Sequence, residues 1–268
     1  MMECLHPGLP ARRARVILFD FDGTLSLLRA GWIDVMVPMM VELLEELKTG
    51  ESEAELRALV KDYVARLTGK QTIYQMIELA SQIEQRGGRP LEPLAYKKMY
   101  HDRLMEKIRH RREALRQGKE SPERYLVPGS RDLLEALKSR GLKLYVASGT
   151  DHAYTVEEAE LLQITSYFDG GIYGAQDDYQ SFSKALLIQE MIQSFECRGD
   201  ELLGFGDGYV EIKNVKDAGG IAVGVATDEP ECRKVDQWKR DRLAQVGADY
   251  IIPNFLCRDE LLQTLFPE

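Results

Sequence analysis

The apolar run at residues 15–19, RVILF, constrains the fold more than any other feature of the sequence. Its length suits a buried β-strand, but a strand needs neighbours that pair with its backbone N–H and C=O groups. The segment that follows, residues 27–121, shows no strand pattern and repeats apolar residues three and four positions apart, which is typical of amphipathic helices. The first strand must therefore pair with strands that come much later in the chain, and the helical segment is an insertion between them.

From residue 122 onward, short apolar runs alternate with helical stretches. Strands are predicted over 142–148, 201–206, 220–226 and 249–252, and helices over 129–140, 183–195, 209–218 and 231–246. Such alternation predicts an α/β fold with a parallel sheet flanked by helices on both faces. The predicted domains are a discontinuous α/β core, 11–26 and 122–268, and an all-helical insert, 27–121, with helices over 33–47, 56–67, 73–83 and 93–116.

The composition excludes several classes of partner. The 268 residues include 35 Lys and Arg against 44 Asp and Glu, a net charge of −9, so no nucleic acid and no membrane surface is expected to bind. No apolar run reaches the roughly 18 residues of a membrane span. The scattered cysteines match no zinc or disulfide pattern, so a reducing, cytoplasmic location is expected. The sequence carries no indication of an oligomeric state.

One segment of this acidic chain is strongly basic. Residues 103–119 contain seven basic residues against Glu106 and Glu113. Such a run is typical of a solvated helix face. The alternative is that part of the segment faces a cleft and steers an anionic substrate.

Ligands of parallel α/β sheets bind beyond the carboxyl ends of the strands, so the residues that follow each strand are the candidates for chemistry. The strand at 15–19 is followed by Asp20 and Asp22, and then by Gly-Thr. Two such carboxylates can divide the work of catalysis, because one can attack as a nucleophile while the other transfers a proton. Their oxygens are also the ligands that Mg²⁺ prefers.

Polar residues follow later strands as well. Ser148 has a hydroxyl that could hold a phosphate oxygen at a helix N-terminus, although an ordinary N-cap would look the same. Lys184 begins a helical stretch and could neutralise a carboxylate and a phosphoryl group together, although most lysines are surface charges. Asp207 follows the strand at 201–206, and Glu211 lies one helical turn further on, so both acids can face one metal site.

The order of these motifs resembles the haloacid dehalogenase-like hydrolase superfamily, which implies a Rossmann-like parallel sheet for the core. The motifs are Asp20-x-Asp22-Gly-Thr24, Ser148, Lys184, and Asp207 with Glu211. The insertion directly after the first motif is similar to the helical cap of phosphoglycolate-phosphatase-like members. The resemblance therefore implies a cap domain over residues 27–121.

The resemblance implies roles for the acidic residues. Asp20 would be the nucleophile and form an aspartyl-phosphate, and Asp22 would protonate the leaving alcohol and later activate water. Magnesium would bind the Asp20 carboxylate, the Asp22 main-chain carbonyl and Asp207. Glu211 would support the metal's shell, although many relatives have aspartate at this position.

The resemblance also implies how the phosphate is held. Its oxygens would contact Thr24, Ser148 and the N–H of Gly149, while Lys184 would balance the charge. Many capped relatives have proline after this lysine, whereas this chain has Ala185.

These residues predict a magnesium-dependent phosphatase that hydrolyses a small phosphomonoester, a phosphorylated metabolite. Phosphoryl transfer is favoured over dehalogenation, because Asp22 supplies a proton that a leaving halide does not need. A phosphomutase or phosphotransferase would use the same residues and is the alternative. A non-catalytic binding protein on this scaffold is less consistent with a complete set of motifs.

Overall fold

A computed structural model of the chain describes residues 2–6, 10–176, 183–194 and 198–267. The described chain forms two compact units, which divide after Ala30 and after Arg111. The first unit contains Met1–Ala30 and Arg112–Glu268, and the second contains Gly31–Arg111. The helical insert expected at 27–121 is longer than this second unit, and its extent as a domain stays a prediction.

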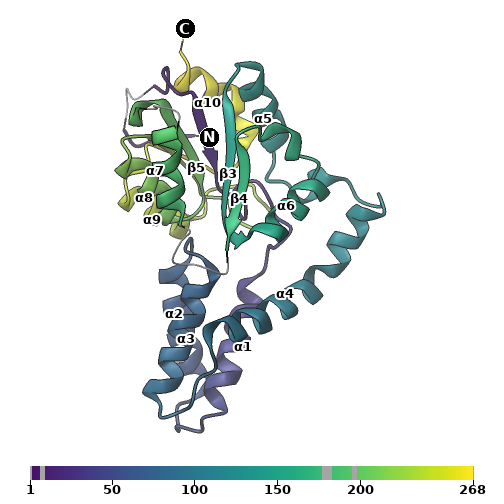
Figure 1. The fold of residues 1–268 in the computed structure, drawn as a ribbon, viewed down its shortest axis with the longest axis vertical. Helices are drawn as coiled ribbons and strands as arrows, with labels where there is room; N and C mark the ends of the chain where they lie inside the picture. Colours follow the sequence, from purple (N-terminus) through teal and green to yellow (C-terminus); the bar gives the residue numbers. More distant parts are fainter. Residues whose placement is uncertain (1, 7–9, 177–182, 195–197, 268) are drawn as a thin grey trace. The chain divides into compact units, whose positions relative to one another are not determined.

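A seven-stranded sheet forms the centre of the first unit (Figure 1). Its strand order is β1-β7-β6-β5-β2-β3-β4. The strands are β1 (Glu3–Cys4), β2 (Val16–Phe19), β3 (Lys143–Asp151), β4 (Gly171–Ala175), β5 (Leu202–Gly206), β6 (Ile221–Val225) and β7 (Tyr250–Ile252). Strand β2 pairs in parallel with β3 and β5, so the first strand does join a sheet built from later parts of the chain. The α/β fold with a Rossmann-like parallel sheet is confirmed, with one addition, because β1 pairs antiparallel to β7 at the edge.

Helices cover both faces of this sheet (Figure 1). On one face lie α5 (Ser130–Ser139), α6 (His152–Leu161) and α10 (Arg258–Leu265); on the other lie α7 (Lys184–Ser194), α8 (Tyr209–Asp217) and α9 (Gln237–Gln245). Alternate residues of β2 point to opposite faces of the sheet. Ile17 and Phe19 pack with α5 and α10, whereas Val16 and Leu18 pack with α7 and α8. A strand buried on both faces explains why residues 15–19 read as a continuous apolar run.

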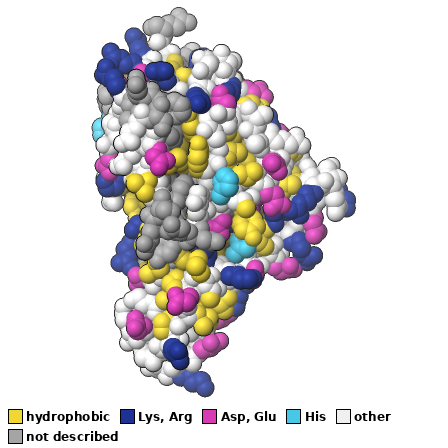
Figure 2. Space-filling model, viewed as in Figure 1, with side chains coloured by type: hydrophobic (Ala, Val, Ile, Leu, Met, Phe, Trp, Pro, Cys, Tyr) yellow, Lys and Arg dark blue, Asp and Glu magenta, His cyan; other side chains and the backbone are white. Residues whose placement is uncertain are grey.

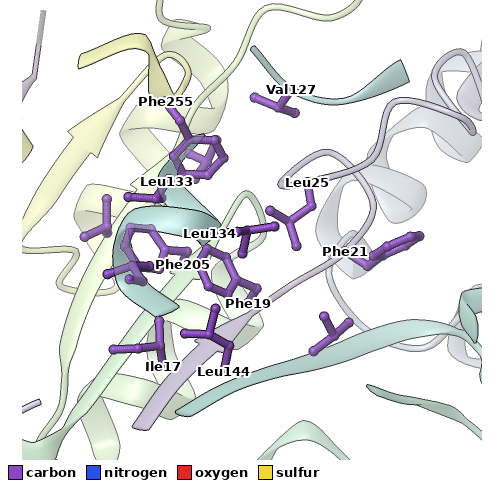
Figure 3. Packing of buried hydrophobic residues seen from close by; sticks show 14 of the residues in the cluster. Ile17, Phe19, Phe21, Leu25, Val127, Leu133, Leu134, Leu144, Phe205 and Phe255 are labelled. Atoms are coloured by element: carbon purple, nitrogen blue, oxygen red, sulfur yellow. The ribbon is translucent and has the colours of Figure 1, made fainter. Parts of the chain in front are cut away.

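Stacked phenylalanines form the centre of one core (Figure 3). The rings of Phe19 and Phe205, on neighbouring strands, lie 4.7 Å apart and nearly parallel. Phe255 meets Phe205 edge-on at 6.0 Å. This cluster therefore ties β2, β5 and the segment before α10 together at the carboxyl end of the sheet.

The sequence pattern missed β1, β4, α6 and α10, and it began α9 too early. Helix α6 carries no apolar stripe because its buried positions include Thr155 and Glu158. Residues 231–236 are not helical; Val235 forms a bridge with Thr227, and Asp236 caps α9 by accepting a hydrogen bond from the N–H of Lys239. Strand β3 also continues three residues past its predicted end at 148, to Asp151.

The second unit is helical, as expected. Its helices are α1 (Ile33–Glu45), α2 (Glu53–Leu67), α3 (Thr72–Gln85) and α4 (Pro93–Arg116), and α4 continues into the first unit. A separate apolar core holds the four together, with Met40, Val60 and Met76 fully buried. Ser52 and Glu55 form a capping box at the start of α2, which satisfies backbone N–H groups there. None of the helices in the described ranges is long and apolar enough to cross a membrane.

Basic residues of the 103–119 segment have acidic partners. Arg103 pairs with Glu42, and Arg109 with Glu106, at 2.7 and 2.8 Å. Figure 2 shows Lys and Arg side chains intermingled with Asp and Glu on the face in view. The ion pairs support the interpretation of this segment as a solvated, paired helix face.

Two neighbouring residues test the packing of the phenylalanine cluster. Phe255 is fully buried, whereas the adjacent Leu256 is 72 % exposed. We expect Phe255→Ala to lower the free energy of unfolding by about 3–5 kcal/mol, because it removes a buried ring and leaves a cavity. Leu256→Ala should change it by less than about 0.5 kcal/mol. Urea denaturation followed by circular dichroism measures both, and equal effects would contradict this description of the core.

Candidate active site

The loop after β2 presents the first pair of aspartates. The N–H of Asp20 donates to the carbonyl of Phe205 at 2.9 Å, so the strand pairing with β5 holds the first aspartate in place. Phe21, between the two aspartates, is fully buried and anchors the loop in the core (Figure 3). The chain then turns at Gly23, which has a φ of +76°. Asp22 precedes this turn and forms an isolated parallel bridge with Ser26, which lies on the other side of the turn.

Glycines allow this loop and the end of β5 to approach closely. A Cβ on Gly23 would lie 2.3 Å from Oδ2 of Asp207, and one on Gly206 would lie 2.2 Å from Cγ of Glu211. Any side chain at these two positions would displace a carboxylate. The glycines are therefore part of the site, because they give the acidic groups room to converge.

Three predicted metal ligands converge at this point. Carboxylate oxygens of Asp20, Asp207 and Glu211 lie within 4.8 Å of one another. Asp20 and Glu211 are buried, with 7 % and 3 % of their surface exposed. Glu211 also accepts a hydrogen bond from the N–H of Gly208 at 2.8 Å, which fixes it in the first turn of α8. Hard oxygen donors gathered in this way fit a small divalent cation such as Mg²⁺.

A lysine that the sequence analysis missed lies beside these acids. The side chain of Lys239 is 15 % exposed, and its Nζ lies 2.9 Å from Asp207 Oδ2 and 2.8 Å from Glu229 Oε1. Burial alone would lower the pKa of Lys239, but the charges of Asp207 and Glu229 outweigh it and raise that pKa above its ordinary value. Its ammonium therefore stays charged and offsets part of the repulsion among the carboxylates. No local pattern marks it, because it lies on a polar helix more than thirty positions from Asp207.

Asp22 lies among groups of mixed charge. Its Oδ2 accepts a hydrogen bond from the hydroxyl of Thr150 at 2.8 Å, and its Oδ1 lies 3.9 Å from Arg29 Nε. Burial raises the pKa of Asp22 to about 6; Arg29 and Thr150 oppose that rise, while Glu158 and Asp207 add to it. A carboxyl with a pKa near neutrality can both give and take a proton under physiological conditions.

Arg29 and Glu158 form a buried ion pair next to Asp22. Arg29 Nε and Nη2 donate to both oxygens of Glu158 at 2.8–3.1 Å. The side chains of Arg29 and Glu158 are 9 % and 0 % exposed. The guanidinium of Arg29 is thus held by Glu158, a residue of α6 that no local sequence pattern marks.

The predicted phosphate-binding residues lie at the same end of the sheet. Thr24 is fully buried in the loop after β2, and its Oγ1 has no hydrogen-bond partner among the described residues. Ser148 and Gly149 lie within β3 and not at a helix N-terminus as expected, because β3 continues to Asp151 before α6 begins. Lys184 is the first residue of α7, and its side chain lies outside the described part of the structure.

Comparisons with known proteins agree with this architecture. The model of a haloacid dehalogenase-like hydrolase family matches residues 14–219. A crystal structure from Haemophilus somnus 129PT, described as a predicted phosphoglycolate phosphatase, is 19 % identical with a TM-score of 0.61, and the match covers 94 % of this chain and 99 % of that one. A phosphonoacetaldehyde hydrolase-like protein from Oleispira antarctica is 13 % identical with a TM-score of 0.61, and the match covers 97 % of each chain.

A third structure, a haloacid dehalogenase family hydrolase from Deinococcus radiodurans R1 with bound phosphate and sodium, is 15 % identical with a TM-score of 0.55. That match covers 94 % of this chain and 97 % of the other. No curated protein sequence matches the chain. At these identities the structural matches show a shared fold, and the family match shows descent.

The carboxylate cluster predicts binding of a divalent cation. Mg²⁺ that binds only the folded protein should stabilise it, by about 2.7 kcal/mol at a concentration of 100 times Kd. We expect MgCl₂ to raise the Tm of the wild type and to leave that of Asp207→Asn unchanged, because one of the three carboxylates is lost.

Asp259→Asn is the matched control, since Asp259 is 81 % exposed on α10 and the substitution removes the same charge. This variant should keep the full shift in Tm. Equal shifts in the wild type and Asp207→Asn would contradict the cluster as the cation site.

Proposed function

This chain belongs to the haloacid dehalogenase-like hydrolase family and is therefore an enzyme, and from that premise we propose that it is a magnesium-dependent phosphatase that hydrolyses a small phosphomonoester. One observation carries the proposal. A buried aspartate at the end of the central strand lies within a cluster of carboxylates, and a second aspartate two residues on lies outside that cluster, where it accepts a hydrogen bond from Thr150 and lies 3.9 Å from Arg29. This arrangement supports two carboxylates with different tasks.

In the first half-reaction, Asp20 is the nucleophile. A carboxylate oxygen of Asp20 attacks the phosphorus, the ester P–O bond breaks, and an aspartyl-phosphate forms. Asp22 gives its proton to the departing alcohol oxygen, so that the alcohol leaves as a neutral molecule. The pKa of Asp22, raised to about 6, supports this role as a general acid.

In the second half-reaction, Asp22 is the base. It takes a proton from water as the water oxygen attacks the phosphorus, and the P–O bond to Asp20 breaks. Inorganic phosphate and the Asp20 carboxylate result, with Asp22 protonated again. One residue can serve both steps because it holds the proton between them.

The phosphoryl oxygens need donors that point into the site. Thr24 Oγ1, which has no hydrogen-bond partner in the described part of the chain, supports this role directly. Ser148 and the N–H of Gly149, beyond the pairing of β3 with β2, are the other donors we propose, with Lys184 as the balancing charge. Such donors stabilise the negative charge of the transferring group.

Asp20, Asp207, Glu211 and the main-chain carbonyl of Asp22 would hold the metal. When bound, Mg²⁺ supplies positive charge that offsets the repulsion between an anionic nucleophile and an anionic phosphoryl group. The chain's own Lys239 already reduces the negative charge around Asp207. Its ammonium donates to Asp207 and Glu229, which leaves Asp20 and Glu211 as metal ligands.

The nucleophile gives the first test. Asp20→Asn should abolish turnover, with a loss of at least about 10³-fold, because the amide cannot form the aspartyl-phosphate. The circular dichroism spectrum and Tm should stay close to those of the wild type. Asp259→Asn, the exposed control, should keep full activity, and magnesium-dependent turnover by Asp20→Asn would contradict the assignment.

Release of inorganic phosphate distinguishes the alternatives. We expect the wild type to release phosphate from at least one member of a panel of metabolite phosphomonoesters, and EDTA to stop the release. Transfer of the phosphoryl group to a second sugar hydroxyl, with little free phosphate, would favour a phosphomutase or phosphotransferase. Binding without either reaction would favour the non-catalytic alternative.

A further inference from the structure

The two carboxylate oxygens of Asp22 have different surroundings. Oδ2 accepts a hydrogen bond from Thr150 Oγ1 at 2.8 Å and lies 3.5 Å from Ser148 Oγ. Oδ1 is buried and has no hydrogen-bond partner in the part of the chain that the structure describes. The hydrogen bond from Thr150 therefore fixes the orientation of the Asp22 carboxyl group.

The backbone around Thr150 holds its hydroxyl in place. Between Ala147 and Asp151, β3 advances four residues while its neighbour β4 advances two, so the strand bulges at Ser148–Thr150. The N–H of Thr150 donates to Ser148 Oγ at 3.0 Å, and its carbonyl accepts from Thr155 Oγ1 at 3.3 Å. Bulges of this kind redirect side chains beside active sites, and here the bulge directs the threonine hydroxyl to Asp22.

The Arg29–Glu158 pair borders the other oxygen. Arg29 Nε lies 3.9 Å from Oδ1, too far for a hydrogen bond, and both Nε and Nη2 donate to Glu158. A buried pair with bidentate geometry is rigid and close to neutral as a whole. The guanidinium therefore lies beside Oδ1 without donating a hydrogen bond to it.

We propose that Thr150 is a positioning residue that holds the Asp22 carboxyl group in the orientation needed for proton transfer, and that Arg29, held by Glu158, borders the other side of that carboxyl group. This inference rests on the proposed phosphatase activity. In the first half-reaction the proton passes from the Asp22 carboxyl group to the alcohol oxygen as the ester bond breaks. In the second it passes from water to the Asp22 carboxylate as the bond to Asp20 breaks, and Thr150 keeps its own proton throughout.

Nitrophenyl phosphate separates the two half-reactions. Nitrophenolate leaves readily without protonation, so formation of the aspartyl-phosphate does not need Asp22, whereas attack by water still does. A variant with a badly placed Asp22 should therefore release nitrophenolate in a rapid burst of about one equivalent per site and then turn over slowly. A damaged fold reduces the burst and the steady rate together, so the burst reports on position and not on stability.

The experiment is stopped-flow release of nitrophenolate by the wild type and Thr150→Val with Mg²⁺ present. We expect Thr150→Val to show the full burst followed by a steady rate about 10- to 100-fold below that of the wild type. Thr150→Ser keeps a hydroxyl at this position and should restore most of the steady rate. Thr264→Val makes the same change on α10, where the hydroxyl donates to the carbonyl of Glu260 at 2.9 Å, and should match the wild type in both phases.

A second variant tests the ion pair. Arg29→Met alone would leave Glu158 buried without its partner, so we pair it with Glu158→Met, which removes both charges. The double variant should also keep the burst and lose steady rate.

Two results would overturn the inference while the proposed function stands: a wild-type steady rate in Thr150→Val, or a burst and a steady rate that fall in equal proportion. A wild type that turns over no phosphomonoester would contradict the proposed function, and the inference with it.

Discussion

The site depends on the parallel pairing of β2 between β3 and β5. In this register Phe19 lies opposite Val146 on one side and Phe205 on the other. Asp20 is one residue beyond that level, and Ser148 and Asp207 are each two residues beyond it. Three segments far apart in the chain thus deliver their first polar residues at one edge, and a shift of one residue in either pairing would separate them.

Gathering these acids has an electrostatic cost that the surroundings reduce. Like-charged carboxylates within 4.8 Å of one another repel, most strongly where they are buried. Lys239, on α9, offsets part of this repulsion from one face of the sheet. Gly23 and Gly206 permit the close approach that side chains would prevent. The same features keep the three carboxylates close enough to share one cation.

How much the sequence could predict follows from how local each signal is. The apolar strand before Asp20 and the alternation after residue 122 are local patterns, so the α/β fold and most of the site were predictable from them. Helix α6 was not, because its buried face carries Thr155 and Glu158 in place of an apolar stripe. Glutamate is usually a surface residue, and the partner that allows Glu158 to be buried, Arg29, lies 129 positions earlier in the sequence. Lys239 is equally inconspicuous on a polar helix.

The sequence by itself determined three properties. These are the order along the chain of the polar residues at the strand ends, the presence of the helical insertion, and the kinds of side chain available at the sheet's edge. Periodicity and residue type decide these properties within a few neighbouring positions. Only the tertiary structure decided which oxygen of Asp22 accepts the hydrogen bond from Thr150, that Lys239 pairs with Asp207, and that Arg29 pairs with Glu158. Such pairings depend on distances between segments that only strand register and helix packing bring together, and no spacing along the chain encodes them.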